Sequence, residues 1–231
     1  DTPRRDRLVV EYNTSTNPAF EVAVRDTSGR GLDGTLVGSS YNATKKALVF
    51  DGVDDIIEAD LGSQIFKNSS LHTTSLWVKL HKHTTSSMQQ FFSLGNGLGN
   101  PNGNLKHIQL FHSDNHGLRL SFTHHDYRVG FVLPIGKWVH VAYTFDGTAW
   151  QNTTTPTNVN IYINGTKVDI TSIYQIGGGG GTLDLSTAKL GLGASTDFAA
   201  TNDRQFAHCD LSNFKLYDTM LTAEEVKTLY D

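Results

Sequence analysis

Apolar and polar residues alternate strictly along two runs of the chain between Lys137 and Lys167. The apolar positions are Val139, Val141, Tyr143 and Phe145 in the first run and Val159, Ile161 and Ile163 in the second. A period of two over five or more residues is typical of half-buried β-strands, because successive side chains point to opposite faces. Asn164-Gly165 follows the second run and is the dipeptide that a type I′ turn prefers, since both central residues need a positive φ. This stretch predicts an antiparallel strand pair joined by a polar loop over residues 147–157.

Similar short runs, separated by turn residues, cover most of the remaining chain. In residues 74–80, Leu76, Val78 and Leu80 share one face, and Trp77 points the opposite way. Thr222-Ala-Glu-Glu225 forms a capping box that predicts a helix over 223–230. Many strands with frequent turns and one terminal helix predict an all-β fold, an antiparallel two-sheet jelly-roll sandwich. We expect a single domain over residues 1–231, since no repeat or linker interrupts the chain.

Composition narrows the partners and the location. A net charge of −4 without a basic patch argues against a nucleic-acid partner. No apolar run approaches the roughly 18 residues of a membrane span, so we expect no membrane insertion. The single cysteine, Cys209, excludes a disulfide within the chain, whereas five glycosylation sequons favour an extracellular protein. The chain starts at Asp1 without Met, which we interpret as a processed or excised piece.

The order of several motifs resembles a known family. They are Leu48-Val-Phe-Asp-Gly-Val-Asp-Asp-Ile-Ile-Glu58, Ser75-Leu-Trp-Val-Lys79, Lys137-Trp-Val-His-Val-Ala-Tyr-Thr-Phe-Asp-Gly147, Val159-Asn-Ile-Tyr-Ile-Asn-Gly165 and residues 211–226. Together they resemble the laminin-G-like, concanavalin A-like lectin/glucanase jelly-roll family over nearly the whole chain. The resemblance implies two curved sheets, often a structural calcium ion, and often glycan or protein binding at the rim. The closing segment also resembles modules of virion proteins of large algal DNA viruses, so we expect an extracellular or virion-surface location.

In similar jelly rolls an early Asp-x-Ser-Gly turn and an Asp near the last strand share one calcium ion. The matching positions here are Asp26 and Asp210, and the carbonyl of Gly31 is a plausible further ligand. We therefore expect a structural Ca²⁺ bound by Asp26, Gly31 and Asp210. The alternative is that Asp26 caps an Asx-turn and Asp210 is an ordinary polar strand residue.

Glycan binding requires aromatic faces for the apolar side of a sugar ring and planar polar groups for its hydroxyls. Trp150, which lies in the polar loop, is the aromatic residue that we expect to form a platform, and its alternative role is to anchor that loop. We expect Trp138 to plug the sandwich edge and Trp77 to be covered by the terminal helix or a loop. An outward polar row is expected from Gln109, Arg119, Ser121, Thr123, Arg128 and His140. The predicted ligand-binding residues are Trp150, Tyr127, His125, Asp126, Arg128, Gln109 and Arg119.

Catalysis has weaker support. A glycosidase needs two facing carboxylates, and the only pair with suitable spacing, Glu58-Ala-Asp60, stands alone. A polysaccharide lyase would need a Tyr or His base together with an Arg or Gln that neutralises the uronate. That inventory is present in His107, Gln109, Arg119, His125, Tyr127 and Arg128.

We therefore expect a non-enzymatic, lectin-like module that binds a glycan or polysaccharide on a cell surface. The main alternative is a protein-adhesion or assembly module without sugar affinity, which would self-associate through a larger parent protein.

Overall fold

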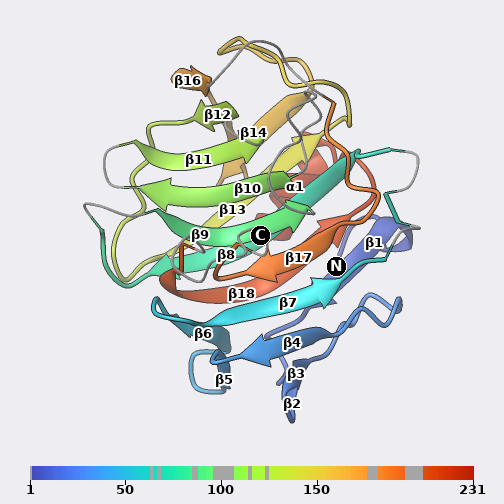
Figure 1. Ribbon diagram of the computed structural model, residues 1–231, viewed down its shortest axis with the longest axis vertical. Helices are drawn as coiled ribbons and strands as arrows, with labels where there is room; N and C mark the ends of the chain where they lie inside the picture. Colours follow the sequence, from blue (N-terminus) through green and yellow to red (C-terminus); the bar gives the residue numbers. More distant parts are fainter. Residues whose placement is uncertain are drawn as a thin grey trace.

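Two antiparallel sheets face each other in the computed structural model of the chain (Figure 1). The structure describes residues 2–62, 65–66, 69–84, 88–95, 107–113, 116–122, 125–175, 182–195 and 205–231. The all-β two-sheet prediction is confirmed. The first and last strands of the chain pair with each other, so the two ends of the described chain close the same sheet.

The first sheet, called sheet A, has eight strands. They run in the order β15-β14-β13-β8-β18-β6-β5, and β1 also pairs with β18. Their bounds are β1 (Leu8–Tyr12), β5 (Ser40–Asn42), β6 (Ala47–Asp51), β8 (His72–Leu80), β13 (Trp138–Phe145), β14 (Val159–Ile163), β15 (Thr166–Val168) and β18 (His208–Tyr217).

The second sheet, called sheet B, has ten strands in the order β16-β12-β11-β10-β9-β17-β7-β4-β3-β2. Their bounds are β2 (Ala19–Phe20), β3 (Ala23–Val24), β4 (Gly34–Val37), β7 (Ile56–Asp60), β9 (Gln89–Gly95), β10 (His107–Ser113), β11 (Gly117–Phe122), β12 (His125–Arg128), β16 (Ser172–Gln175) and β17 (Lys189–Leu192).

The strand pair predicted between residues 137 and 167 is confirmed. Val141 of β13 pairs with Ile163 of β14, and the register continues to the Phe145–Val159 pair. Asn164 and Gly165 both have positive φ, 50° and 73°, as a type I′ turn requires. The alternation therefore fixes which side chains of β13 face the core.

The terminal helix α1 (Ala223–Tyr230) is also confirmed, together with its capping box. The Thr222 hydroxyl accepts from the Glu225 backbone N–H, and the Glu225 carboxylate accepts from the Thr222 N–H. The helix packs over the β14–β15 turn. A β-carbon at Gly165 would lie 2.8 Å from Lys227 and 3.0 Å from Tyr230, so only glycine allows this close approach. A short 3₁₀ turn, η1 (Arg5–Arg7), precedes β1.

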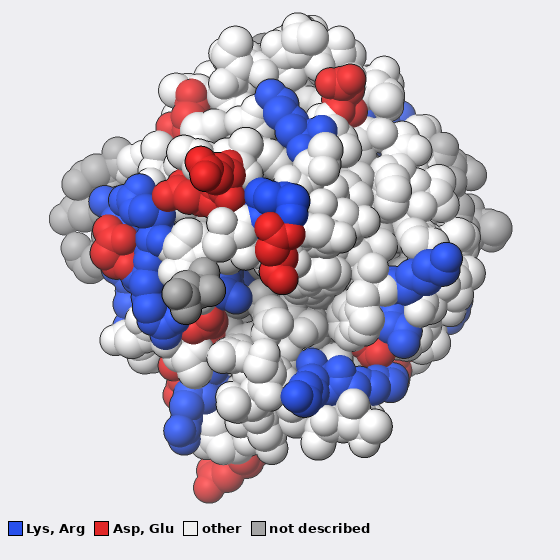
Figure 2. All heavy atoms as spheres, turned by 180° about the vertical axis from the view of Figure 1, so that it is seen from behind, with Lys and Arg blue, Asp and Glu red and all other residues white. Residues whose placement is uncertain are grey.

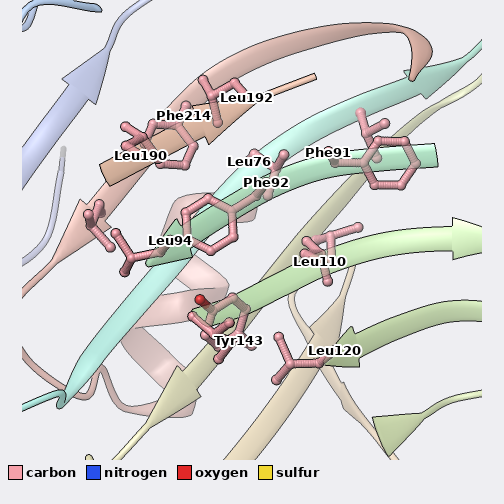
Figure 3. Packing of buried hydrophobic residues seen from close by; sticks show 14 of the residues in the cluster. Leu76, Phe91, Phe92, Leu94, Leu110, Leu120, Tyr143, Leu190, Leu192 and Phe214 are labelled. Carbon is pink, nitrogen blue, oxygen red and sulfur yellow. The ribbon is translucent and has the colours of Figure 1, made fainter. Parts of the chain in front are cut away.

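The core lies between the sheets and is filled by alternate residues of both (Figure 3). Phe92 of sheet B contacts Tyr143 and Phe214 of sheet A, with ring centroids 6.0 and 5.8 Å apart. The lone cysteine, Cys209, is fully buried, and burial raises the pKa of its thiol. Cys209 therefore packs as a small apolar residue.

One predicted strand is shorter than its pattern suggests. The alternation from Tyr127 to Leu133 predicts a strand, but β12 ends at Arg128 and residues 129–134 are irregular. Gly130 adopts φ +66°, which bends the chain away from the sheet direction. Within the described residues, no helix is long and apolar enough to cross a membrane.

Candidate functional site

The predicted ligand-binding residues of β12 lie on opposite faces of sheet B. Tyr127 pairs with Leu120, whose side chain faces the core, whereas Asp126 pairs with Ser121 on the outer face. Because side chains alternate along a strand, His125 and Tyr127 point inward while Asp126 and Arg128 point outward. The prediction that these four residues form one binding rim is therefore wrong.

Trp150 is a buried loop anchor and does not form an exposed platform. Its side chain is 4% exposed and stacks on His125 and Tyr127, with ring centroids 4.6 and 5.7 Å apart. Tyr127 donates to the Gln151 carbonyl at 2.8 Å, which ties the same loop to β12. The loop is polar, yet its one indole fills the end of the core. Trp150, His125 and Tyr127 therefore serve packing.

The outward polar residues of sheet B satisfy one another. The Asp126 carboxylate lies 3.2 Å from Arg119 and 3.8 Å from Arg128. Arg119 also donates to Ser113 at 2.8 Å, and Gln109 donates to Ser195 at 3.0 Å. Gln109, Arg119 and Asp126 are buried, so these groups are already paired within the protein.

The lyase inventory is divided in the same way. His125 and Tyr127, the candidate bases with described side chains, lie on the core face, and Arg119, Arg128 and Gln109 lie on the outer face. His125 and Tyr127 therefore do not converge with these groups on one sugar. The side chain of His107 and the whole of Thr123 fall outside the described residues. His140 is on sheet A, so it does not extend the outward polar row of sheet B.

Asp26 is held by hydrogen bonds from the protein. Its carboxylate accepts from the backbone N–H groups of Glu11 at 2.9 Å, Ser28 at 2.8 Å and Leu32 at 3.0 Å, and from the Ser28 hydroxyl at 2.7 Å. The bond from Ser28, two residues on, is the Asx-turn of the alternative interpretation. Gly31, with φ +71°, completes this turn.

Asp210 lies elsewhere on the sandwich. Asp26 contacts the backbone of Glu11, which pairs with Lys215 of β18. Lys215 is five residues from Asp210 along that strand, or roughly 16 Å. Asp210 is instead fully buried beside His81, at 2.8 Å, and Lys45, at 3.2 Å. Asp26 and Asp210 are therefore too far apart in this structure to share one calcium ion with Gly31, and calcium binding itself stays a prediction.

The acidic turn after β6 brings three carboxylates together. Ligand oxygens of Asp51, Asp54 and Asp55 lie within 4.8 Å of one another. Asp55 and Asp51 are engaged with backbone N–H groups of the turn itself, at 2.7 Å each. This is the geometry of a β-turn with hydrogen-bonded carboxylates.

A pocket on the outer face of sheet A brings two other tryptophans together. Trp77 of β8 pairs with His140 of β13, and Trp138 of β13 pairs with Lys79 of β8. The two indoles are therefore diagonal neighbours on one face, where Cβ atoms are about 7–8 Å apart. Both are half-buried, so they are accessible to a ligand.

The pocket, which we call the Trp77–Trp138 pocket, has a volume of about 320 Å³. Polar groups line its remaining wall. The described residues that line it are Ser15, Lys45, Lys46, Trp77, Trp138, Ser212 and Asn213. This set combines aromatic faces with hydroxyl, amide and ammonium donors, which are the groups that hold a sugar ring and its hydroxyls. Figure 2 shows the molecule from behind, with a broad uncharged central area bordered mainly by Lys and Arg at its lower and right margins.

The C-terminal helix covers part of the Trp77 indole. The Tyr230 ring stacks on the Trp77 indole with a centroid distance of 5.6 Å and an interplanar angle of 21°. His140 contacts the same indole at 5.3 Å and shares a 2.8 Å hydrogen bond with Ser75. Burial, with a smaller contribution from the Lys215 ammonium, lowers the pKa of His140 to about 4. His140 is therefore neutral at pH 7 and packs beside Trp77.

Sequence reasoning assigned Trp138 to the sandwich edge and missed this pocket. The signal was present in the alternation itself. Val139, Val141 and Tyr143 face the core, so Trp138 must face outward, as Trp77 does beside Leu76 and Val78. The lysines come from the turn between β5 and β6, and their proximity depends on strand order, which a local pattern does not specify.

Solved structures with a similar fold include carbohydrate-active proteins. Domain 4 of AbnA, a GH43 extracellular arabinanase from Geobacillus stearothermophilus solved with arabinotriose, is 22% identical with a TM-score of 0.65. The match covers 97% of this chain and 98% of that one. Trypanosoma rangeli sialidase in complex with sialic acid is 19% identical, with a TM-score of 0.67. That match covers 99% of this chain but 33% of the sialidase, so this chain corresponds to about a third of the enzyme.

At these identities the likeness concerns the fold alone. A comparison with curated proteins finds no match. The family profile described as the concanavalin A-like lectin/glucanases superfamily matches residues 51–227, which include β7 to β18 and the first part of α1. The chain therefore belongs to the concanavalin A-like lectin/glucanase superfamily.

Proposed function

We propose that this chain is a non-catalytic carbohydrate-binding module and that its sugar site is the Trp77–Trp138 pocket. The observation that carries the proposal is the pair of half-buried indoles on adjacent strands, which line one open pocket together with Ser212 and Asn213. Ligand sites in proteins typically combine apolar or aromatic walls with a few placed polar groups. Indole faces suit the apolar C–H face of a pyranose or furanose ring.

The polar groups of the pocket are arranged to contact hydroxyls. Asn213 adopts φ 48° at the irregular register of β18, and its side-chain oxygen accepts from the Thr14 N–H at 3.2 Å. Within the described residues its amide nitrogen has no acceptor, so its two N–H groups are available to a ligand. Ser15 offers a hydroxyl on the same wall.

The absence of catalysis is part of the proposal. Among the described residues that line the pocket, none carries a carboxylate, and hydrolysis of a glycosidic bond typically requires two. We place the module outside the cell or on a virion surface, where a glycan partner would be displayed. The five sequons support this location.

The test is a glycan array followed by titration calorimetry of the best ligand. Trp138→Ala is expected to weaken binding tenfold or more, because truncating a central aromatic anchor typically costs about 2 kcal/mol or more. Tyr174→Ala is the matched control, since Tyr174 is 44% exposed on the outer face of sheet B. It should leave the affinity within twofold.

Two outcomes would contradict the proposal. One is wild-type affinity in both Trp77→Ala and Trp138→Ala, with folding verified by circular dichroism. The other is a folded protein that binds no glycan on the array and self-associates in sedimentation, which would favour an adhesion or assembly module.

A further inference from the structure

The Trp77–Trp138 pocket has a basic rim. Lys45 and Lys46 occupy the turn between β5 and β6, and both line the pocket. Its described lining residues include no Asp or Glu. A neutral sugar would gain little from two ammonium groups, whereas a charged one would gain ionic hydrogen bonds.

We propose that the ligand of this pocket is an anionic carbohydrate, with a carboxylate or sulfate next to the ring that stacks on the indoles. The inference rests on the proposed function and specifies its ligand class. Lys46 and Lys45 are the residues that contact the anionic group.

Lys46 supplies a free ammonium group on a fixed backbone. It has a positive φ of 49°, and its carbonyl accepts from the Ser212 hydroxyl at 3.4 Å. The neighbouring Lys45 N–H donates to the Asn42 side chain at 2.9 Å, which closes the same turn. Among the described residues Lys46 has no ion-pair partner, and its side chain is exposed. The turn therefore presents an uncompensated positive charge to the pocket.

Lys45 is positioned by a buried carboxylate. Its ammonium lies 3.2 Å from Asp210, which is 0% exposed, while the Lys45 side chain remains 40% exposed. An ammonium group has three donors, so Lys45 can hold Asp210 with one and a ligand oxygen with another. Lys45 is paired with Asp210 and Lys46 is not, so one ammonium charge at the pocket rim is left for a single anionic group on the ligand.

Matched pairs of oligosaccharides test the inference. Each pair has the same linkage and differs only in a hydroxymethyl group replaced by a carboxylate, or in one added sulfate. We expect wild-type protein to bind the anionic member at least tenfold more tightly at low salt, and to lose much of this preference at 0.5 M NaCl because salt screens exposed charges.

Lysine variants test whether Lys45 and Lys46 cause the preference for the anionic oligosaccharide. Lys46→Gln should reduce the preference about three- to tenfold, and Lys45→Gln with Lys46→Gln should reduce it further. Lys189→Gln, an exposed lysine on β17 of sheet B, is the matched control and should leave the preference unchanged. If loss of the Asp210 partner prevents the double variant from folding, Lys46→Gln alone still decides.

The outcomes separate this inference from the proposed function. Equal affinity for neutral and anionic members, or a preference that Lys46→Gln does not change, would overturn the inference. If such binding were still abolished by Trp138→Ala, the sugar site itself would stand. Binding that both tryptophan variants leave intact would overturn the two together.

Discussion

The outer faces of the two sheets use similar residues in opposite ways. On sheet B, charged and polar side chains are abundant, but Arg119 and Asp126 are buried and paired with each other, and the buried Gln109 donates to Ser195. On sheet A, two tryptophans and two lysines line an open pocket. Polarity on an outward strand face therefore indicates solvent or internal pairing as readily as a binding site. Unpaired donors beside accessible aromatic faces are the more informative combination.

The three tryptophans show the same contrast. Trp150, in a polar loop, is buried against His125 and Tyr127, whereas Trp77 and Trp138, in regular strands, are accessible. The sequence does not determine whether the side chain of a loop residue turns inward. In a strand, alternation determines the face to which each side chain points.

The largest expected effect is on stability at the sheet B end. Trp150→Ala should lower the free energy of unfolding by about 3–5 kcal/mol, because it leaves a cavity in a packed stack. Urea denaturation measures this, with Tyr174→Ala as an exposed control. A decrease in the free energy of unfolding below about 1 kcal/mol would mean that the Trp150 indole is not a core residue. The difference drawn between Trp150 and the two accessible tryptophans would then not hold.

Asp126→Ala should lower the free energy of unfolding by about 2–4 kcal/mol, because it leaves the Arg119 and Arg128 guanidinium groups without their shared carboxylate. Glycan affinity at the Trp77–Trp138 pocket should stay within twofold. Denaturation and calorimetry on one preparation check both statements. Loss of glycan binding without loss of stability would instead place the ligand on sheet B.

Acidic pH should weaken the fold through buried histidines. Burial lowers the pKa of His72 and of His140 to about 4, from about 6.5 in the unfolded chain. The unfolded state therefore binds more protons below pH 6.5, and stability falls as the pH falls. Between pH 6.5 and 5, where most carboxylates remain ionised, protonation linked to each histidine should lower the free energy of unfolding by about 1–2 kcal/mol.

Urea midpoints across this range measure the slope, and His140→Gln should reduce it. His140 lies beside Trp77 on sheet A, so this variant also reports on the packing of that indole. A stability that does not change between pH 6.5 and 5 would show that both histidines titrate normally in the folded protein.

The smallest expected effect concerns Asp26 and Asp210. Because they lie far apart and have different partners, the effects of Asp26→Ala and Asp210→Ala on stability should add within about 0.5 kcal/mol. The two single variants and the double variant form a double-mutant cycle, and their stabilities are measured in calcium and again with a chelator. A coupling energy above 1 kcal/mol that disappears with the chelator would restore a shared ion.

Local sequence patterns predicted the parts of the fold that depend on local physics. The β13–β14 pair, the Asn164-Gly165 turn and the capping box at Thr222 all follow from residues near in sequence. The site depended on neighbours distant in sequence. Lys45 and Trp77 line the same pocket because β6 and β8 lie on either side of β18. The alternation of apolar and polar residues does not predict this strand order.

Two errors at the candidate site had different causes. The prediction of one rim from His125 to Arg128 placed adjacent strand residues on the same face. The alternation that predicts the inward residues of β13 also predicts opposite faces for these neighbours. The shared calcium ion was carried over from a resemblance, whereas in this structure Asp26 accepts four hydrogen bonds and Asp210 lies beside other partners.

The indole N–H signals of the three tryptophans test the sugar site most directly. In a ¹H–¹⁵N spectrum, each of Trp77, Trp138 and Trp150 gives one indole resonance, assigned by single Trp→Phe variants. Titration with the best array ligand should shift the Trp77 and Trp138 signals in a saturable way and leave the Trp150 signal in place. Saturable binding that moves Trp150 alone, or none of the three, would contradict a sugar site between Trp77 and Trp138.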